Sequence, residues 1–169
     1  MAKIERQYNA FSIKSAIPLP DRHYYYFLRN AIESAKYRIW GSIFLVNVTR
    51  EHDYHLEVRD IIKLLSYKRS LGINVRVIIG HSKTTPAIRE ADEIARRYMH
   101  SRGILVRRYK GTKTSTHSKY VIIDDDLVVL GSHNWTMNAF SKSKEDSIAI
   151  YSKEINRELD RQFLATWMD

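Results

Sequence analysis

Side chains that could bind and attack a phosphate recur at regular spacing in the second half of the sequence. His117 and Lys119 are two positions apart, and so are Ser132 and Asn134. Residues two apart on a strand point to the same face, so each pair should share a face. Two apolar runs joined by three aspartates predict a hairpin between the pairs. Such a hairpin would bring an imidazole, an ammonium, a hydroxyl and an amide to one end of a sheet, a composition suited to phosphate.

The spacing of these residues resembles a known motif. The pattern reads His117-x-Lys119-x4-Asp124-x6-Gly131-Ser132-x-Asn134. It is similar to the HKD motif of the phospholipase D superfamily, with every interval kept. The order of predicted elements also resembles the small bacterial endonucleases of that superfamily, which carry one motif and a glutamate eleven positions after its asparagine. Glu145 stands at that distance. The resemblance implies a phospholipase D-like half-domain that hydrolyses phosphodiesters.

The chemistry of these side chains agrees with the resemblance. A neutral imidazole can attack phosphorus when a carboxylate holds its other nitrogen and fixes the tautomer. We therefore predict His117 as the nucleophile and Glu145 as its orienting partner. The Lys119 ammonium and the Asn134 amide would donate to the non-bridging oxygens as charge builds in the transition state. The Ser132 hydroxyl would donate to the same phosphate.

Asp124 is predicted to support the site rather than to act in it. It lies seven positions after His117, an odd number, so a regular strand would turn it to the opposite face. We assign Asp124 and Gly131 structural roles, and we interpret Asp125 and Asp126 as solvated turn residues.

The sequence has one HKD motif, whereas the reaction needs groups on both sides of phosphorus. His117 cannot be at once the nucleophile and the general acid for the leaving oxygen. His133 should face away from its neighbours Ser132 and Asn134, so a packing or surface role is favoured. By resemblance to the two-motif enzymes, we expect a homodimer in which the second His117 is the acid. Water would then cleave the phosphohistidine, and no metal or other cofactor is expected.

Length and composition favour one domain that spans residues 1–169. Hydrophobic residues make up 44% of the chain, enough for a core, and the lack of cysteine excludes disulfides and cysteine-based sites. The N-terminus lacks the apolar segment of a signal peptide, and no apolar run approaches the roughly 18 residues that span a bilayer. We therefore expect a cytoplasmic protein without stable membrane insertion.

The formal net charge of +9 favours polyanionic partners, with nucleic acid before anionic membrane surfaces. Basic residues could simply solvate the surface, but residues 102–119 contain six of them and no acidic residue. This run leads into the predicted nucleophile and would focus a positive field there. The residues predicted to contact nucleic acid, with DNA favoured over RNA, are Arg107, Arg108, Lys110 and Lys113.

The order of helical and strand patterns predicts an α/β fold with a mixed β-sheet flanked by helices. Residues 1–20 are expected to form an irregular arm or a short edge strand, and Asp21 to cap the first helix. Residues 137–144 are interpreted as a loop. A last helix should begin after Ser152 and place five residues inward, namely Ile155, Leu159, Phe163, Leu164 and Trp167.

Two clusters allow either a functional or a structural interpretation. His52, Asp53 and His55 raise the question of a metal site, but no further ligand set accompanies them and a solvated loop is favoured. The aromatic residues 24–27 could stack on bases, although a role in the core and at its rim is favoured.

Three functions remain open on the sequence alone. The favoured one is a metal-independent endonuclease, because the motif, the net charge and the basic run agree. A phospholipid-processing enzyme of the same superfamily would use the same residues, but it would need an exposed apolar or amphipathic face that no segment clearly supplies. A non-catalytic nucleic-acid-binding module would show salt-sensitive binding without turnover.

Overall fold

A single mixed sheet forms the centre of the computed structural model, which describes residues 10–48, 56–80, 82, 84–111 and 116–168. Its strands in chain order are β1 (Ser15–Pro20), β2 (Arg38–Ile43), β3 (Asn74–Ile79), β4 (Leu105–Arg108), β5 (Lys119–Ile123), β6 (Leu127–Gly131) and β7 (Asp146–Tyr151). Across the sheet their order is β1-β7-β6-β5-β2-β3-β4. The strands β2, β3 and β4 are parallel, and the remaining neighbours are antiparallel. The predicted fold class is confirmed.

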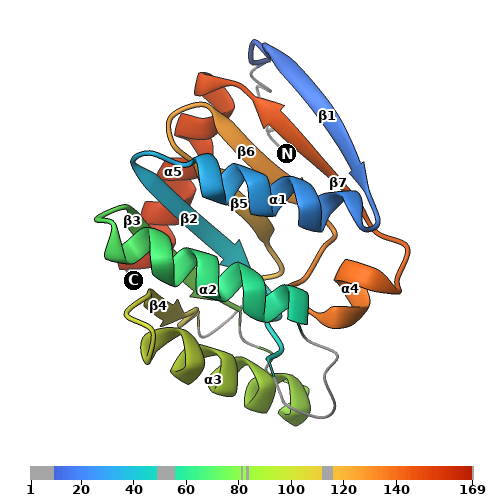
Figure 1. Ribbon diagram of the computed structural model, residues 1–169, viewed down its shortest axis with the longest axis vertical. Helices are drawn as coiled ribbons and strands as arrows, with labels where there is room; N and C mark the ends of the chain where they lie inside the picture. The colour runs from blue at the N-terminus through green and yellow to red at the C-terminus, as the bar shows by residue number, and fades with distance from the viewer. Residues whose placement is uncertain (1–9, 49–55, 81, 83, 112–115, 169) are drawn as a thin grey trace, which may run out of the picture.

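Helices cover both faces of this sheet (Figure 1). They are α1 (His23–Ser34), α2 (Leu56–Ser70), α3 (Pro86–His100), α4 (Met137–Ser141) and α5 (Lys153–Met168). In the view of Figure 1, α1 and α2 cross the front of the sheet and α5 lies behind it. The larger core lies on the α1–α2 side, and a smaller one under α5 joins Trp40 to Phe163 and Trp167. None of the described helices is both long and apolar enough to cross a membrane.

The β5–β6 hairpin has the predicted form and places the motif. Tyr120 pairs with Leu130 and Ile123 with Leu127, so the start of β5 and the end of β6 lie at one end of the hairpin. Asp124 begins the turn at the other end and has a φ of +49°, a left-handed conformation that aspartate tolerates better than most residues. The length of the strands therefore separates Asp124 from the two ends of the motif, which lie together.

The N-terminal region differs in part from the predictions. Of the two expectations for residues 1–20, the edge strand applies to Ser15–Pro20, whereas residues 1–9 lie outside the described residues. The prediction that Asp21 caps α1 is wrong, because Arg22 occupies the N-cap position. The Asp21 carboxylate instead lies 2.7 Å from the ammonium of Lys144, and this contact fixes the start of α1 against the segment before β7.

The second half of the chain brings two further corrections. Residues 137–144 were expected to form a loop, but they contain α4, whose N-cap Thr136 accepts a hydrogen bond from the N–H of Ala139. The Thr136 cap and the burial of Phe140 stabilise this helix, whose sequence pattern is too short to predict it. Leu164 was expected to face inward, but 37% of it is exposed, whereas Phe163 and Trp167 are buried as expected.

Candidate active site

The residues of the motif that could act on phosphate come together at one end of the sheet. His117 and Lys119 lie at the start of β5, and Ser132 and Asn134 follow the end of β6. Glu145 directly precedes β7, whose first residues pair with the end of β6. The sheet order β7-β6-β5 therefore gathers three chain segments at one end, because antiparallel neighbours bring their alternate ends together.

His117 and Lys119 contact each other at this end. The Lys119 Nζ lies 2.8 Å from the carbonyl oxygen of His117 and 3.2 Å from its Nδ1. Partial burial, followed by the nearby Lys119 charge, lowers the pKa of the exposed His117 imidazole below its ordinary value. Burial also lowers the pKa of Lys119, against the opposing charge of Glu145. The lowered pKa keeps His117 neutral near pH 7, as a nucleophile requires.

Glu145 contacts Ser132 rather than the imidazole with which it was expected to pair. The Ser132 Oγ donates a short hydrogen bond to Glu145 Oε2 and accepts one from the N–H of Asp146 at 3.0 Å. The carboxylate stays close enough to Lys119 for its charge to oppose the lowering of that amine's pKa by burial. Glu145 thus orients the Ser132 hydroxyl and adds negative charge beside Lys119.

Gly131 allows this contact because a side chain would not fit there. A Cβ on Gly131 would come within 2.2 Å of Ser147 Oγ and 2.4 Å of the carbonyl oxygen of Asp146. The backbone of β6 can therefore approach β7 closely enough for Ser132 to reach Glu145. This geometry supports a structural role for Gly131.

Asn134 is oriented by the segment that follows β2. Its Oδ1 accepts a hydrogen bond from the N–H of Leu45 at 3.2 Å, which leaves the amide nitrogen as the group that can donate to a ligand. Trp135 continues this connection, since its N–H donates to the carbonyl oxygen of Leu45 at 3.0 Å. The Val46 N–H donates to the buried carboxylate of Asp92 on α3 at 3.2 Å.

Two other polar residues of the motif region are structural. His133 is fully buried, stacks on Tyr24 at 4.2 Å and contacts Ser147 Oγ at 2.7 Å, so of its two expected roles packing applies. Asp124 lies at the far end of β5 from His117, where its carboxylate accepts hydrogen bonds from the N–H groups of residues 36–38. This position accords with the supporting role assigned to Asp124.

The predicted nucleic-acid contacts divide between two environments. Arg107 faces α5, where its guanidinium donates to the carbonyl oxygen of Trp167 and lies 4.8 Å from the centre of that ring. Arg108 is the last residue of β4, at the same end of the sheet as His117, and both it and Lys110 are exposed. Lys113 lies outside the described residues. Arg108 and Lys110 are thus better placed than Arg107 to meet a ligand.

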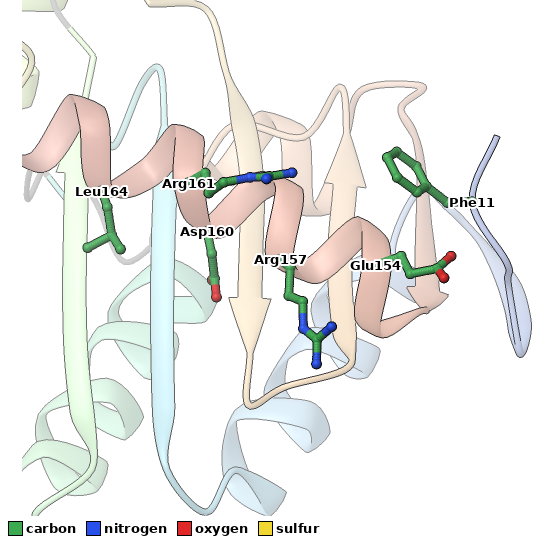
Figure 2. Close-up of a pocket in the computed structure, with 6 residues that line it drawn as sticks. All are labelled: Phe11, Glu154, Arg157, Asp160, Arg161 and Leu164. Carbon is green, nitrogen blue, oxygen red and sulfur yellow. The ribbon is translucent and has the colours of Figure 1, made fainter. Parts of the chain in front are cut away.

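A hollow beside α5, away from the motif, carries different chemistry. Figure 2 shows it, lined by Phe11, Glu154, Arg157, Asp160, Arg161 and Leu164. Its acidic groups have partners: Glu154 accepts a hydrogen bond from the N–H of Ser12 at 2.7 Å, and Asp160 lies 2.7 Å from Arg38. These contacts attach α5 to the N-terminal segment and to β2, which is a structural use of charge.

Among the described residues, no group of three histidine, aspartate or glutamate side chains is arranged to hold a metal ion. His52, Asp53 and His55, which raised that question in the sequence, lie outside the described residues.

Sequence patterns did not single out Phe44, Gly80 or Asp92, although each contacts the site or its support. Phe44 lies at 4.5 Å from the His117 ring, and Gly80 lies against Phe44. A phenylalanine or a glycine at the end of a strand and an aspartate on a helix are all common, so residue type alone did not indicate a functional role.

The fold and the gathered side chains have the form of a phospholipase D-like domain. A family model described as "Cardiolipin synthase, PLD-like domain" matches residues 28–167, and the chain belongs to this phospholipase D-like family. Relatives include mitochondrial cardiolipin hydrolase of Danio rerio, 29% identical over 104 residues (62% of this chain, 43% of that protein), and that of Chlamydomonas reinhardtii, 27% identical over 111 residues (66% and 46%). The chain thus spans less than half the length of these curated relatives.

Three solved structures share the fold. Nuc from Salmonella typhimurium, a phospholipase D family member, has a TM-score of 0.74 and 22% identity, covering 90% of this chain and 93% of that one. NucT from Helicobacter pylori has a TM-score of 0.70 and 20% identity, covering 91% and 96%. Phosphatidylserine synthase from Haemophilus influenzae has a TM-score of 0.68 and 16% identity, covering 89% and 38%.

Proposed function

We propose that this chain is a metal-independent endonuclease that cleaves nucleic-acid phosphodiesters through a phosphohistidine on His117. The observation that carries the proposal is the meeting of His117, Lys119, Ser132 and Asn134 at one end of the sheet, in a chain of net charge +9. The exposed Arg108 at that end supports a polyanionic substrate, and duplex DNA is the substrate we favour.

In the proposed reaction, Nε2 of His117 attacks phosphorus and the bond to the leaving oxygen breaks. An acid protonates that oxygen, and water then attacks phosphorus and releases the histidine. Attack by Nε2 requires the proton on Nδ1, whereas an ammonium 3.2 Å from Nδ1 favours the other tautomer. We infer that bound phosphate draws Lys119 away from Nδ1, which can then carry the proton, and that Glu145 stabilises the resulting imidazolium.

A second copy of the chain would supply the acid. His133, the other histidine within the motif, is fully buried and stacked on Tyr24, so it cannot reach the leaving oxygen. His117 is itself exposed, which leaves room for an opposing subunit. We therefore propose a homodimer with one composite site that contains both copies of His117.

Plasmid cleavage in excess EDTA tests the reaction. We expect the wild-type protein and the His100→Ala control to cleave, and His117→Ala to be inactive; His100 is exposed at the end of α3. Loss of wild-type cleavage in EDTA would contradict the metal-independent mechanism. Purified heterodimers of wild-type and His117→Ala chains test the composite site, since one shared site predicts almost no activity and independent sites predict half.

A phospholipid substrate is the second candidate, supported by the cardiolipin hydrolases among the relatives and by the description of the family model. The phosphodiesters of cardiolipin could be cleaved by the same residues. Cardiolipin-containing vesicles and plasmid DNA, assayed side by side with wild-type and His117→Ala protein, separate the two candidates. DNA binding with a log–log salt slope of about −0.9 per phosphate contacted, without turnover of either substrate, would instead indicate the binding module.

A further inference from the structure

Phe44, the residue that follows β2, lies against both His117 and Lys119. The centres of its ring and of the His117 ring are 4.5 Å apart, with the rings tilted by 51°. The Lys119 Nζ lies 5.1 Å from the centre of the same Phe44 ring. Phe44 is half-buried, so its ring forms part of the wall of the site rather than part of the core.

Gly80, the residue after β3, holds Phe44 in this position. A Cβ on Gly80 would come within 2.5 Å of the carbonyl oxygen of Phe44 and 2.8 Å of its Cα and Cδ2. The Gly80 N–H also donates to the carbonyl oxygen of Ile43 at 2.8 Å. The backbone after β3 therefore lies directly against Phe44, and only glycine allows this approach.

We propose that Phe44 is a positioning residue, whose ring holds the His117 imidazole in place and attracts the Lys119 ammonium to the wall of the site, and that Gly80 keeps the ring in place. The proposal rests on the function proposed above for His117 and Lys119. It adds to the site a residue that directly follows β2, a strand outside the motif.

Two physical effects of the ring support this role. A tilted arrangement is a favourable geometry for two aromatic rings at this separation, and a cation within about 6 Å of a ring centre is attracted to its face. The ring also displaces water from one side of each group. Burial is the largest cause of the lowered pKa of both His117 and Lys119, so Phe44 helps to keep the nucleophile neutral.

Three substitutions separate these effects. Phe44→Tyr keeps the ring, and we expect turnover within about twofold of wild type. Phe44→Leu keeps an apolar cover but loses the cation–π attraction, so kcat should fall about three- to thirtyfold with little change in KM. Phe44→Ala removes both, and the pKa of His117, followed by NMR of its ring carbon, should rise toward the ordinary value. In Phe44→Leu that pKa should stay low.

Gly80→Ala tests the support with Phe44 intact, and we expect the same fall in kcat as in Phe44→Leu. The matched control is Gly41→Ala in β2, where a Cβ would meet its nearest atom at 3.6 Å, an ordinary contact. Phe27→Leu on α1 controls for loss of a half-buried ring elsewhere.

The NMR titration needs no substrate, so it tests the positioning role even if the chain cleaves neither DNA nor lipid. An unchanged His117 pKa in Phe44→Ala would overturn the proposal. The proposal would also be overturned if, across Phe44→Tyr, Phe44→Leu and Phe44→Ala, the loss of turnover were fully accounted for by the loss of stability measured in urea.

Discussion

The two ends of the β5–β6 hairpin are both polar, and they use their polar groups in opposite ways. At the turn, the Asp124 carboxylate accepts hydrogen bonds of 2.8–3.2 Å from the backbone N–H groups of residues 36–38. At the other end, His117 is exposed and its ring contacts only the side chains of Phe44 and Lys119 among the interactions of the described residues. The polar groups at the turn are used in structural hydrogen bonds, whereas the end with His117 is open to a ligand.

Arg38 shows how rigid the turn end is. Its guanidinium donates to the carbonyl oxygen of Asp124 at 2.9 Å and to Asn156 Oδ1 at 2.9 Å, and it lies 2.7 Å from Asp160. These contacts join β2, the hairpin turn and α5. A motif whose far end is fixed in this way can present His117 and Lys119 from a strand that does not shift, which is what a preorganised site requires.

The largest expected effect comes from changing the open end. His117→Ala should reduce turnover of the proposed nuclease by at least about 10³-fold, because it removes the nucleophile. Stability in urea should change by no more than about 0.5 kcal/mol, since the side chain is exposed. A variant that unfolds more readily would show that His117 also supports the fold. A variant that still turns over substrate would show that His117 is not the nucleophile.

The converse experiment is Asp124→Ala at the turn. It removes one acceptor of three backbone N–H groups and leaves alanine at a φ of +49°, so we expect a loss of about 3 kcal/mol of stability. Turnover per folded molecule should stay within a few-fold of wild type. Asp125→Ala is the matched control, because that side chain is 76% exposed and its contact with Arg38 is long, at 3.7 Å. Equal destabilisation by both variants would remove the distinction between the two aspartates.

Asp92 on α3 supports the segment after β2 that leads to the open end of the hairpin. Its buried carboxyl should make the stability of the protein depend on pH. Its carboxyl is buried, one oxygen has no partner, and burial raises its pKa to about 7. Between about pH 4 and pH 7 the folded protein keeps a proton that the unfolded chain releases, so the free energy of unfolding falls as pH rises across this window and levels off above pH 7. Asp92→Asn should gain on the order of 2 kcal/mol relative to wild type between pH 5 and pH 8.

Urea unfolding at the two pH values measures this difference. Glu93→Gln is the control: ion pairs with Arg96 and Arg97 help to lower the pKa of Glu93 to about 2, well below this window. A wild-type stability that tracks Asp92→Asn at both pH values would mean that the buried carboxyl has a partner or an ordinary pKa.

The sequence predicted the hairpin and the residues at its ends because both depend on local spacing. A period of two fixes which residues share a face, and a turn between two apolar runs fixes which ends meet. The odd interval between His117 and Asp124 likewise separated the reactive end from the supporting one. These inferences needed no knowledge of the rest of the fold.

Contacts between distant segments could not be read in this way. Phe44 meets His117 only because β2 is the sheet neighbour of β5, and no spacing in the sequence encodes that order. Asp21 has the residue type of a helix cap, but its carboxylate contacts Lys144 and the N–H of Glu145 instead. Glu145 lies at the interval expected by resemblance, yet the geometry of Gly131 and Ser132 determines which group it contacts.

The smallest expected effects concern substrate binding at the open end. Arg108→Ala should weaken duplex DNA binding about three- to tenfold and reduce the magnitude of the log–log salt slope by about 1, because one phosphate contact is lost. Arg107→Ala should change the slope less, since its guanidinium is engaged with Trp167 under α5. Fluorescence anisotropy across a salt series measures both. An equal change in slope for the two arginines would place DNA on the α5 side as well, and the open end of the hairpin would then not be the sole binding surface.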